Sequence, residues 1–183
     1  MITCGSETSG GIRNVEVYNI KAYGTNVGIR FKSTQGRGGT VRDIRIHDIE
    51  MKDVKRAILV DYNWHPAYNT IPEKVRKEIE EEGKELPHHW TVLMQKVPEK
   101  EGTPYIRDIT IKNVNAVDSD TAFHIRGLEK QRAGSFYLEN VNITAAKAGS
   151  IRNAENWIFK NVCVKAKDNS KVELVNCENM SGM

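Results

Sequence analysis

The sequence predicts an all-β fold, a parallel β-helix in which successive coils of the chain stack on one another. One short pattern recurs along the 183 residues, clearly at 12–20, 41–49 and 106–114 and more weakly at 137–143, 158–164 and 173–177. Apolar and polar residues alternate in each copy, which is the period of a strand with one buried face, and most are β-branched or aromatic. Repeats of this kind predict about five coils.

A polar residue occupies one fixed place in each copy of the repeat. It is Asn or Asp, at positions 19, 48, 113, 140, 161 and 176. The spacing from Asn19 to Asp48 is 29 residues, and it falls to 21 residues between Asn140 and Asn161. Stacked Asn side chains can hydrogen-bond from one coil to the next, as amide ladders do in stacked sheets. We therefore expect a ladder of side-chain hydrogen bonds along these positions.

A second strand is predicted in each coil, at residues 28–32, 57–61 and 122–126. Each of these segments begins nine residues after the Asn or Asp of its coil, so we expect the three to stack in register. Alternation places Ile29 and Phe31 inside the solenoid. The outward column then contains Arg30, Lys32, Asp61, His124 and Arg126, with Tyr62 at its edge.

The longest interval between copies predicts an excursion from the solenoid. From Asp48 to Asn113 there are 65 residues, roughly 36 more than one coil needs. The extra residues fall at 66–104, and within them a helix is predicted over 72–83, with Pro72 at its start and Gly83 past its end. We treat residues 1–183 as a single partial β-helix domain, with 66–104 inserted at one corner.

Composition excludes several classes of function. The formal net charge is +3, too mild for a nucleic-acid-binding domain, which usually has clustered basic residues and a pI above about 9. No apolar run of about 18 residues is present, so no membrane span is predicted. The three cysteines, Cys4, Cys163 and Cys177, have no C-x-x-C spacing, so neither a disulfide framework nor a zinc site is predicted. We expect no cofactor and no metal.

The outward column is the candidate binding surface. Arginine offers a fork of N–H donors that matches a carboxylate, and lysine offers a point charge, so a basic column suits an acidic polymer. Spacing alone leaves a second interpretation open, an ordinary solvated face. His124 has the same two interpretations, a contact to the bound saccharide or an outward histidine in solvent.

Three motifs carry a resemblance to a known family. Residues 5–11 read GSETSGG, Arg30-Phe31-Lys32 forms a basic pair around an apolar residue, and Asp61-Tyr62 ends the equivalent strand one coil later. These resemble, in order, the segment after the catalytic histidine, the R-I-K substrate motif and the position of a substrate-contacting tyrosine in glycoside hydrolase family 28. That family contains polygalacturonases and rhamnogalacturonases, and Phe31 departs from its usual Ile.

The resemblance implies a right-handed, pectin-lyase-like β-helix that binds an acidic pectic oligosaccharide. The family hydrolyses glycosidic bonds with inversion: one carboxylic acid protonates the leaving oxygen and other carboxylates activate water. Residues that match its substrate contacts are Arg30, Lys32 and Tyr62, and the column adds His124. Full-length relatives would be secreted or periplasmic, although the first residues of this sequence do not resemble a signal peptide.

The family's catalytic groups have no counterpart in this sequence. They occupy an N-T-D segment, a D-D pair and a G-H-G segment, all upstream of the motif at residues 5–11. We therefore expect no catalytic residue here, and a C-terminal part of a polygalacturonase-like hydrolase that is inactive alone. The alternatives are a non-catalytic polyuronate-binding module and an inactive truncated remnant. The expected partner is a complementing N-terminal half or a second copy that pairs with the open N-terminal coil.

Overall fold

The computed structural model describes residues 2–65, 71–93, 95 and 97–183. Its strands run along most of the chain and are listed in order: β1 Ile2–Cys4, β2 Ile12–Tyr23, β3 Val27–Lys32, β4 Thr40–Lys52, β5 Arg56–Asp61, β6 Tyr105–Arg126, β7 Ala133–Arg152, β8 Ala154–Ala166, β9 Glu173–Val175 and β10 Glu178–Ser181. The helices are α1 Glu73–Glu82, α2 His88–Leu93 and α3 Glu99–Gly102.

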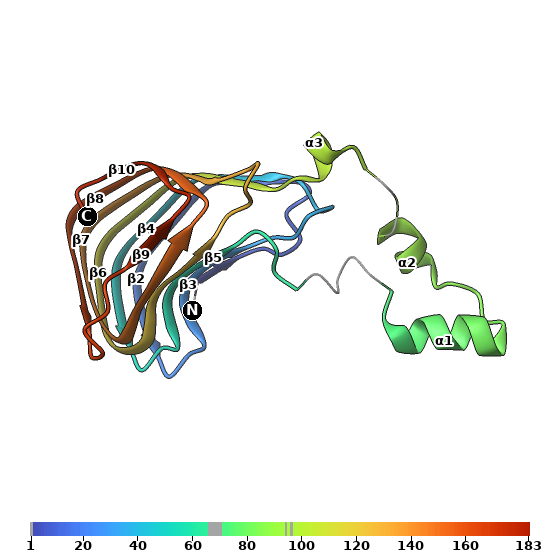
Figure 1. Ribbon diagram of the computed structural model, residues 1–183, viewed down its shortest axis with the longest axis horizontal. Coiled ribbons are helices and arrows are strands. Elements are labelled where there is room, and N and C mark those ends of the chain that lie inside the picture. The colour runs from blue at the N-terminus through green and yellow to red at the C-terminus, as the bar shows by residue number, and fades with distance from the viewer. Residues whose placement is uncertain (1, 66–70, 94, 96) are drawn as a thin grey trace.

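The strands form a solenoid of stacked parallel strands (Figure 1). β1, β3, β5, β6, β7, β8 and β10 pair in that order, while β2 pairs with β4 and β4 with the first half of β6. Every pairing between the described strands is parallel. Since each coil contributes strands to the same faces, the predicted parallel β-helix is confirmed.

The core runs along the inside of the solenoid as columns of apolar side chains. Ile29 and Phe31 have no exposed surface, as the alternation predicted. Aromatic rings stack through successive coils: the centroid of Phe136 lies 6.0 Å from that of Phe31 and 4.1 Å from that of Trp157. Burial of each such side chain contributes about 1.5–3 kcal/mol, so this continuous core is what makes the stacking of coils favourable.

The predicted Asn/Asp ladder is confirmed over four coils. Asn113 Nδ2 donates to Asp48 Oδ1 at 2.9 Å, Asn140 to Asn113 at 3.2 Å and Asn161 to Asn140 at 3.1 Å. The prediction is wrong for Asn176, whose Nδ2 donates to Asn153 Oδ1 at 2.7 Å. The reason is register: Val175 pairs with Arg152, so the next residues, 176 and 153, stack on each other.

Backbone conformation gives a second reason for the Asn and Asp residues. All members of the ladder have positive φ, from 51° at Asn113 to 57° at Asp48, and so does Asn19 at 55°. Most L-residues avoid this left-handed region, whereas Asn and Asp tolerate it through local hydrogen bonds. Each coil therefore bends sharply at this position, and the same residue type supports both the bend and the ladder.

The segment between β5 and β6 leaves the solenoid and contains the three helices (Figure 1). The helix predicted over 72–83 is confirmed as α1, flanked by Pro72 and by Gly83 in the left-handed conformation. No residue of α1 is fully buried. Residues 66–70, 94 and 96 of the predicted excursion lie outside the described residues. Within the described part of the chain, no helix has the length and apolar character needed to cross a membrane.

Candidate functional site

The predicted outward column forms with the expected register. Arg30 pairs with Leu59 and Leu59 with His124, while Lys32 pairs with Asp61 and Asp61 with Arg126. Adjacent strands lie about 4.8 Å apart, so side chains of neighbouring coils can touch. We call the surface made by Arg30, Lys32, Trp64, His124 and Arg126 the basic face.

Trp64 is the residue that organises the basic face, and the sequence analysis missed it. The Arg30 guanidinium carbon and the Lys32 ammonium nitrogen each lie 5.4 Å from the centroid of its ring. Both distances are within the range of cation–π attraction. The backbone N–H of Trp64 donates to the carbonyl of Ser33 at 2.9 Å, which holds the chain after β5 against the end of β3. The Trp64 ring thereby lies against both cations, which alternation along β3 places on the same side of the solenoid.

The surroundings of Arg30 and Lys32 orient their charged ends. Arg30 Nε donates to Thr3 Oγ1 of β1 at 3.2 Å. Partial burial lowers the pKa of Lys32 from its ordinary value, and the nearby Arg30 charge lowers it further, while Glu7 opposes the shift. A lysine whose charge is already disfavoured gains more than an ordinary surface lysine from an anionic ligand, because the ligand supplies the missing counter-charge.

The motif at residues 5–11 packs against the loop that follows β3. Gly5 has a φ of 105°, and a Cβ there would collide with the carbonyl oxygen of Lys32, so this position requires glycine. Thr8 is buried, with its hydroxyl 2.7 Å from Ser33 Oγ and donating to the Gly38 carbonyl at 2.9 Å. The motif therefore supports the backbone beneath Lys32 from the preceding coil.

Asp61 neutralises Arg126 within the column. The two Asp61 oxygens accept from Arg126 Nε at 3.1 Å and from its Nη2 at 2.6 Å, a bidentate pair. Asp61 Oδ1 also accepts from the backbone N–H of Asn63 at 2.9 Å. Asp61 is 3% exposed, so its carboxylate is fixed in this pair and supports the turn before Trp64.

Tyr62, which was expected to contact the substrate, lies in the core and not at the edge of the outward column. Its side chain is 0% exposed, and its hydroxyl donates to the Ile106 carbonyl at 2.8 Å and accepts from the Ile106 N–H at 2.7 Å. Burial raises the pKa of Tyr62 well above its ordinary value. The physical reason is that the chain turns after Asp61, which directs Tyr62 inward and brings Trp64 to the surface.

His124 lies on the basic face as a half-buried side chain. Burial lowers its pKa from the ordinary value, and the charge of Arg56 lowers it further. A neutral imidazole can donate from one nitrogen and accept at the other. Its placement fits hydrogen bonding to a hydroxyl better than binding to a carboxylate.

The end of the excursion returns to the same side of the molecule. The Gly102 carbonyl, at the end of α3, accepts from the N–H groups of Gly36 and Gly38 at 2.8 and 2.9 Å. These glycines belong to the loop after β3, which also carries Ser33. The basic face is therefore bordered by the motif at residues 5–11, by this loop and by α3. Among the described residues, no cluster of His, Cys, Asp and Glu side chains is arranged to hold a metal ion.

Comparisons of the sequence with known proteins point to one family. The sequence model described as "Glycosyl hydrolases family 28" matches residues 2–80. A probable polygalacturonase of Vitis vinifera is 28% identical over 152 residues, which is 82% of this chain and 26% of that protein. An endo-polygalacturonase of Pectobacterium parmentieri is 28% identical over 164 residues, 90% of this chain and 31% of that protein.

A solved structure shows the same fold. The family 28 exopolygalacturonase of Yersinia enterocolitica superposes with a TM-score of 0.71 at 19% identity, over 98% of this chain and 28% of that one. The fold is thus the right-handed parallel β-helix. The chain is thus similar to glycoside hydrolase family 28 and to its polygalacturonases, and it spans about a quarter to a third of the length of these relatives.

Proposed function

We propose that this chain forms the part of a pectin-acting glycoside hydrolase that binds acidic sugar units, through Arg30, Lys32 and Trp64. The observation that supports this most is the placement of both cations 5.4 Å from the centroid of a single tryptophan ring. The residues come from adjacent coils, so the solenoid itself fixes their spacing. The relationship to polygalacturonases supplies the substrate class, a polymer of galacturonate.

The chemistry of the basic face suits a uronic acid. Arg30 can bind a carboxylate through two parallel N–H···O bonds, and Lys32 can approach the same group as a point charge. The aromatic ring of Trp64 offers an apolar surface for the C–H face of a sugar ring. Arg126 lies beside these residues with its guanidinium paired with Asp61.

We propose that the chain does not hydrolyse polygalacturonate by itself. Inverting glycosidases need two carboxyl groups separated by about 6.5–9.5 Å, one as acid and one as base. The family segments N-T-D, D-D and G-H-G are not found in the 183 residues. Asp61 is engaged with Arg126, which leaves Glu7 as the carboxylate next to Lys32. A reducing-sugar assay that showed turnover abolished by Glu7→Gln would overturn this part of the proposal.

A non-catalytic module that binds polyuronate through the same basic face is the second candidate. This candidate predicts the same affinity of the purified chain for polygalacturonate. It also predicts that adding another part of a hydrolase does not make the chain hydrolyse the polymer. Adding a chain that carries the N-T-D, D-D and G-H-G segments separates the two: restored hydrolysis of polygalacturonate supports the first candidate, and unchanged binding without hydrolysis supports the second.

Calorimetric titration with trigalacturonate tests the binding proposal. Arg30→Ala and Lys32→Ala should each weaken binding by about 1–3 kcal/mol, the range for hydrogen bonds to charged groups. Lys52→Ala is the matched control, because Lys52 is an exposed lysine that precedes the start of β5, whereas the basic face lies at the end of that strand. Added salt should weaken the binding that remains in each variant. Equal affinity in the parent chain and in both variants would leave the basic face as an ordinary solvated surface.

We also propose that a strand from a partner pairs along β2. Its inward residues Ile12, Val15, Val17 and Ile20 are only partly buried, whereas their partners in β4 are fully buried. Of the described strands, β2 pairs with β4 alone. The partner is a complementing half of the solenoid or a second copy of this chain. Light scattering over a dilution series decides about the second copy: a concentration-independent monomer would exclude it.

A further inference from the structure

A groove runs along the Asn/Asp ladder, at a corner of the solenoid that the basic face does not include. Its volume is about 630 Å³, and it crosses four successive coils. Two polar columns border it, the ladder itself and the outward residues two positions further along each strand. The first column contributes Asn19, Asp48, Asn113 and Asn140, and the second Lys21, Glu50, Asn115 and Asn142.

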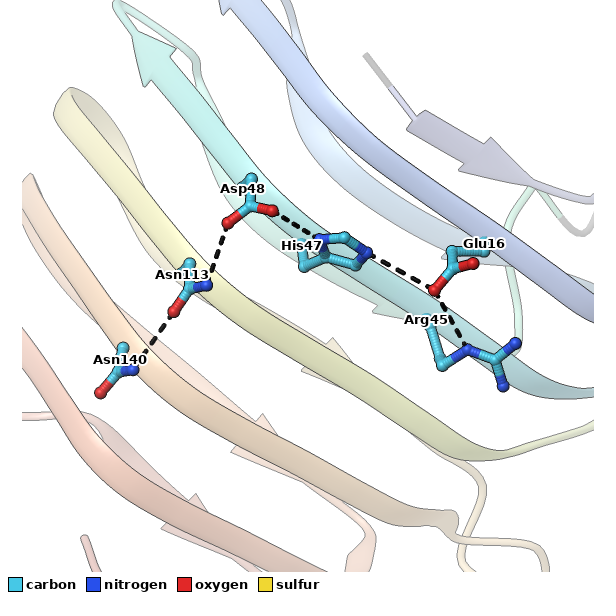
Figure 2. Close-up of polar contacts among 6 residues, drawn as sticks. All are labelled: Glu16, Arg45, His47, Asp48, Asn113 and Asn140. Atoms are coloured by element: carbon cyan, nitrogen blue, oxygen red, sulfur yellow. Dashed lines mark hydrogen bonds and ion pairs between the residues drawn. The ribbon is translucent and has the colours of Figure 1, made fainter.

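The charges of this groove are already paired. Lys21 Nζ lies 3.2 Å from Glu50 Oε2. Asp48 Oδ2 lies 2.6 Å from Nδ1 of His47, which also faces Glu16 at 3.5 Å (Figure 2). The hydrogen bonds that a ligand could gain therefore come mostly from neutral amides, so the groove suits an uncharged ligand rather than an ion.

The ladder amides all point the same way, and Asp48 is the cause. Hydrogen bonds from His47 and Asn113 hold the pKa of Asp48 below its ordinary value, so its carboxylate stays ionised and can only accept. Asn113 must then turn its N–H₂ toward Asp48 and its oxygen toward Asn140, which repeats the orientation (Figure 2). Each amide uses one N–H and one lone pair in the ladder and keeps one of each for a ligand.

This arrangement presents a regular array of donors and acceptors. The array repeats at the distance between coils, about 4.8 Å. A sugar hydroxyl both donates and accepts, so it can bond to the spare N–H of one amide and the spare lone pair of its neighbour. An aromatic pair adjoins the ladder: Tyr18 is 54% exposed and its ring stacks on His47 with centroids 5.3 Å apart. The C–H face of a sugar can pack on such a ring.

We propose that this ladder groove binds a neutral, hydroxyl-rich saccharide, independently of the acidic sugars bound at the basic face. The chain would then hold two chemically different parts of a polysaccharide, or two chains of it, on two corners of one solenoid. The inference rests on the groove, the paired charges and the oriented amides, and it does not depend on the function proposed for the basic face.

Galactotetraose is the probe for this groove, because galactose shares the hydroxyl arrangement of galacturonic acid and lacks its carboxylate. The exposed amides of Asn115 and Asn142 line the groove as a pair on adjacent strands and can bond to the same saccharide beside the ladder. The test variant is therefore Asn115→Ala/Asn142→Ala, since neither residue belongs to the ladder that supports the fold. Asp120→Ala is the control, an exposed polar residue of the same strand as Asn115 that does not line the groove. Thermal unfolding checks that all three proteins are equally folded.

Calorimetric titration should show galactotetraose binding to the parent chain and to Asp120→Ala. The double variant should bind it about tenfold more weakly, as expected for loss of two hydrogen bonds. Its affinity for trigalacturonate should stay the same, which separates this proposal from the one for the basic face. No binding of galactotetraose to the parent chain, or equal binding by the double variant, would overturn the inference.

Discussion

The basic face and the ladder corner differ in how far successive coils repeat each other. At the ladder corner nearly every coil places Asn or Asp in the same left-handed conformation. In the column that forms the basic face the stacked residues change from coil to coil, from Arg30 to the buried Leu59 to His124. Repetition marks a position where the fold limits the choice of residue. Where the stacked residues vary, the fold does not determine which residue stands at the position.

The largest effect on stability is expected at the ladder. Asn113→Ala removes two ladder hydrogen bonds and places a Cβ-bearing residue that lacks local hydrogen bonds at a φ of 51°. We expect a loss of about 2–3 kcal/mol in the free energy of unfolding, because left-handed strain and lost bonds add. Asn113→Gly also removes the two hydrogen bonds, but glycine adopts this φ without strain. Its free energy of unfolding should therefore fall by only about 1 kcal/mol. Urea denaturation measures both; equal losses would mean that the backbone conformation contributes nothing.

Tyr62→Phe should come next, and it tests the assignment of this tyrosine to the core. The change leaves the buried N–H and C=O of Ile106 without their hydroxyl partner. An unsatisfied buried group costs about 1–3 kcal/mol, so the urea midpoint should fall. The affinity for trigalacturonate should not change, since the hydroxyl faces the interior. Weaker binding of trigalacturonate with unchanged stability would contradict the assignment of Tyr62 to the core and would support a substrate contact.

A smaller effect on stability is expected when acid protonates Glu139, the residue before Asn140 in β7. Hydrogen bonds from Lys160 at 2.7 Å and Lys112 at 2.9 Å lower the pKa of Glu139 from 4.5 to about 2. A lowered folded-state pKa contributes stability above the unfolded value, and this is lost as pH falls from about 4.5 through about 2. Glu139→Gln should therefore differ from the parent at pH 6 and converge with it near pH 2 in thermal unfolding. A constant difference across this range would contradict the assignment.

The same comparison explains what the sequence predicted and what it did not. The repeat predicted the strands, their parallel stacking and the pairing of Lys32 with Asp61, because a period of two with one buried face leaves a single register. The repeat wrongly predicted that Asn176 continues the ladder of Asn161, whereas Asn176 stacks on Asn153. The strand before it, β9, has only three residues, so the spacing of the earlier coils no longer applies there. Repeats predict positions that recur, and β9 is where the recurrence ends.

The site was predicted less completely than the fold. Arg30 and Lys32 lie on a regular strand, so alternation placed them outside. Tyr62 and Trp64 follow the end of β5, where alternation no longer determines which side chain turns inward. The sequence does show that Trp64 is a large aromatic residue close to the end of the column. That was the available signal that it could belong to the basic face. Choosing between them required the hydrogen bonds of Ile106 and of Ser33, which the sequence does not contain.

The measurement that tests the central claim most directly is the affinity of Trp64 variants for trigalacturonate. Trp64 has no charge, yet its ring holds the two cations of the basic face. Trp64→Ala should therefore weaken binding about tenfold, and Trp64→Phe, which keeps a ring under both cations, should weaken it less. Binding by Trp64→Ala as tight as that of the parent chain would contradict the account.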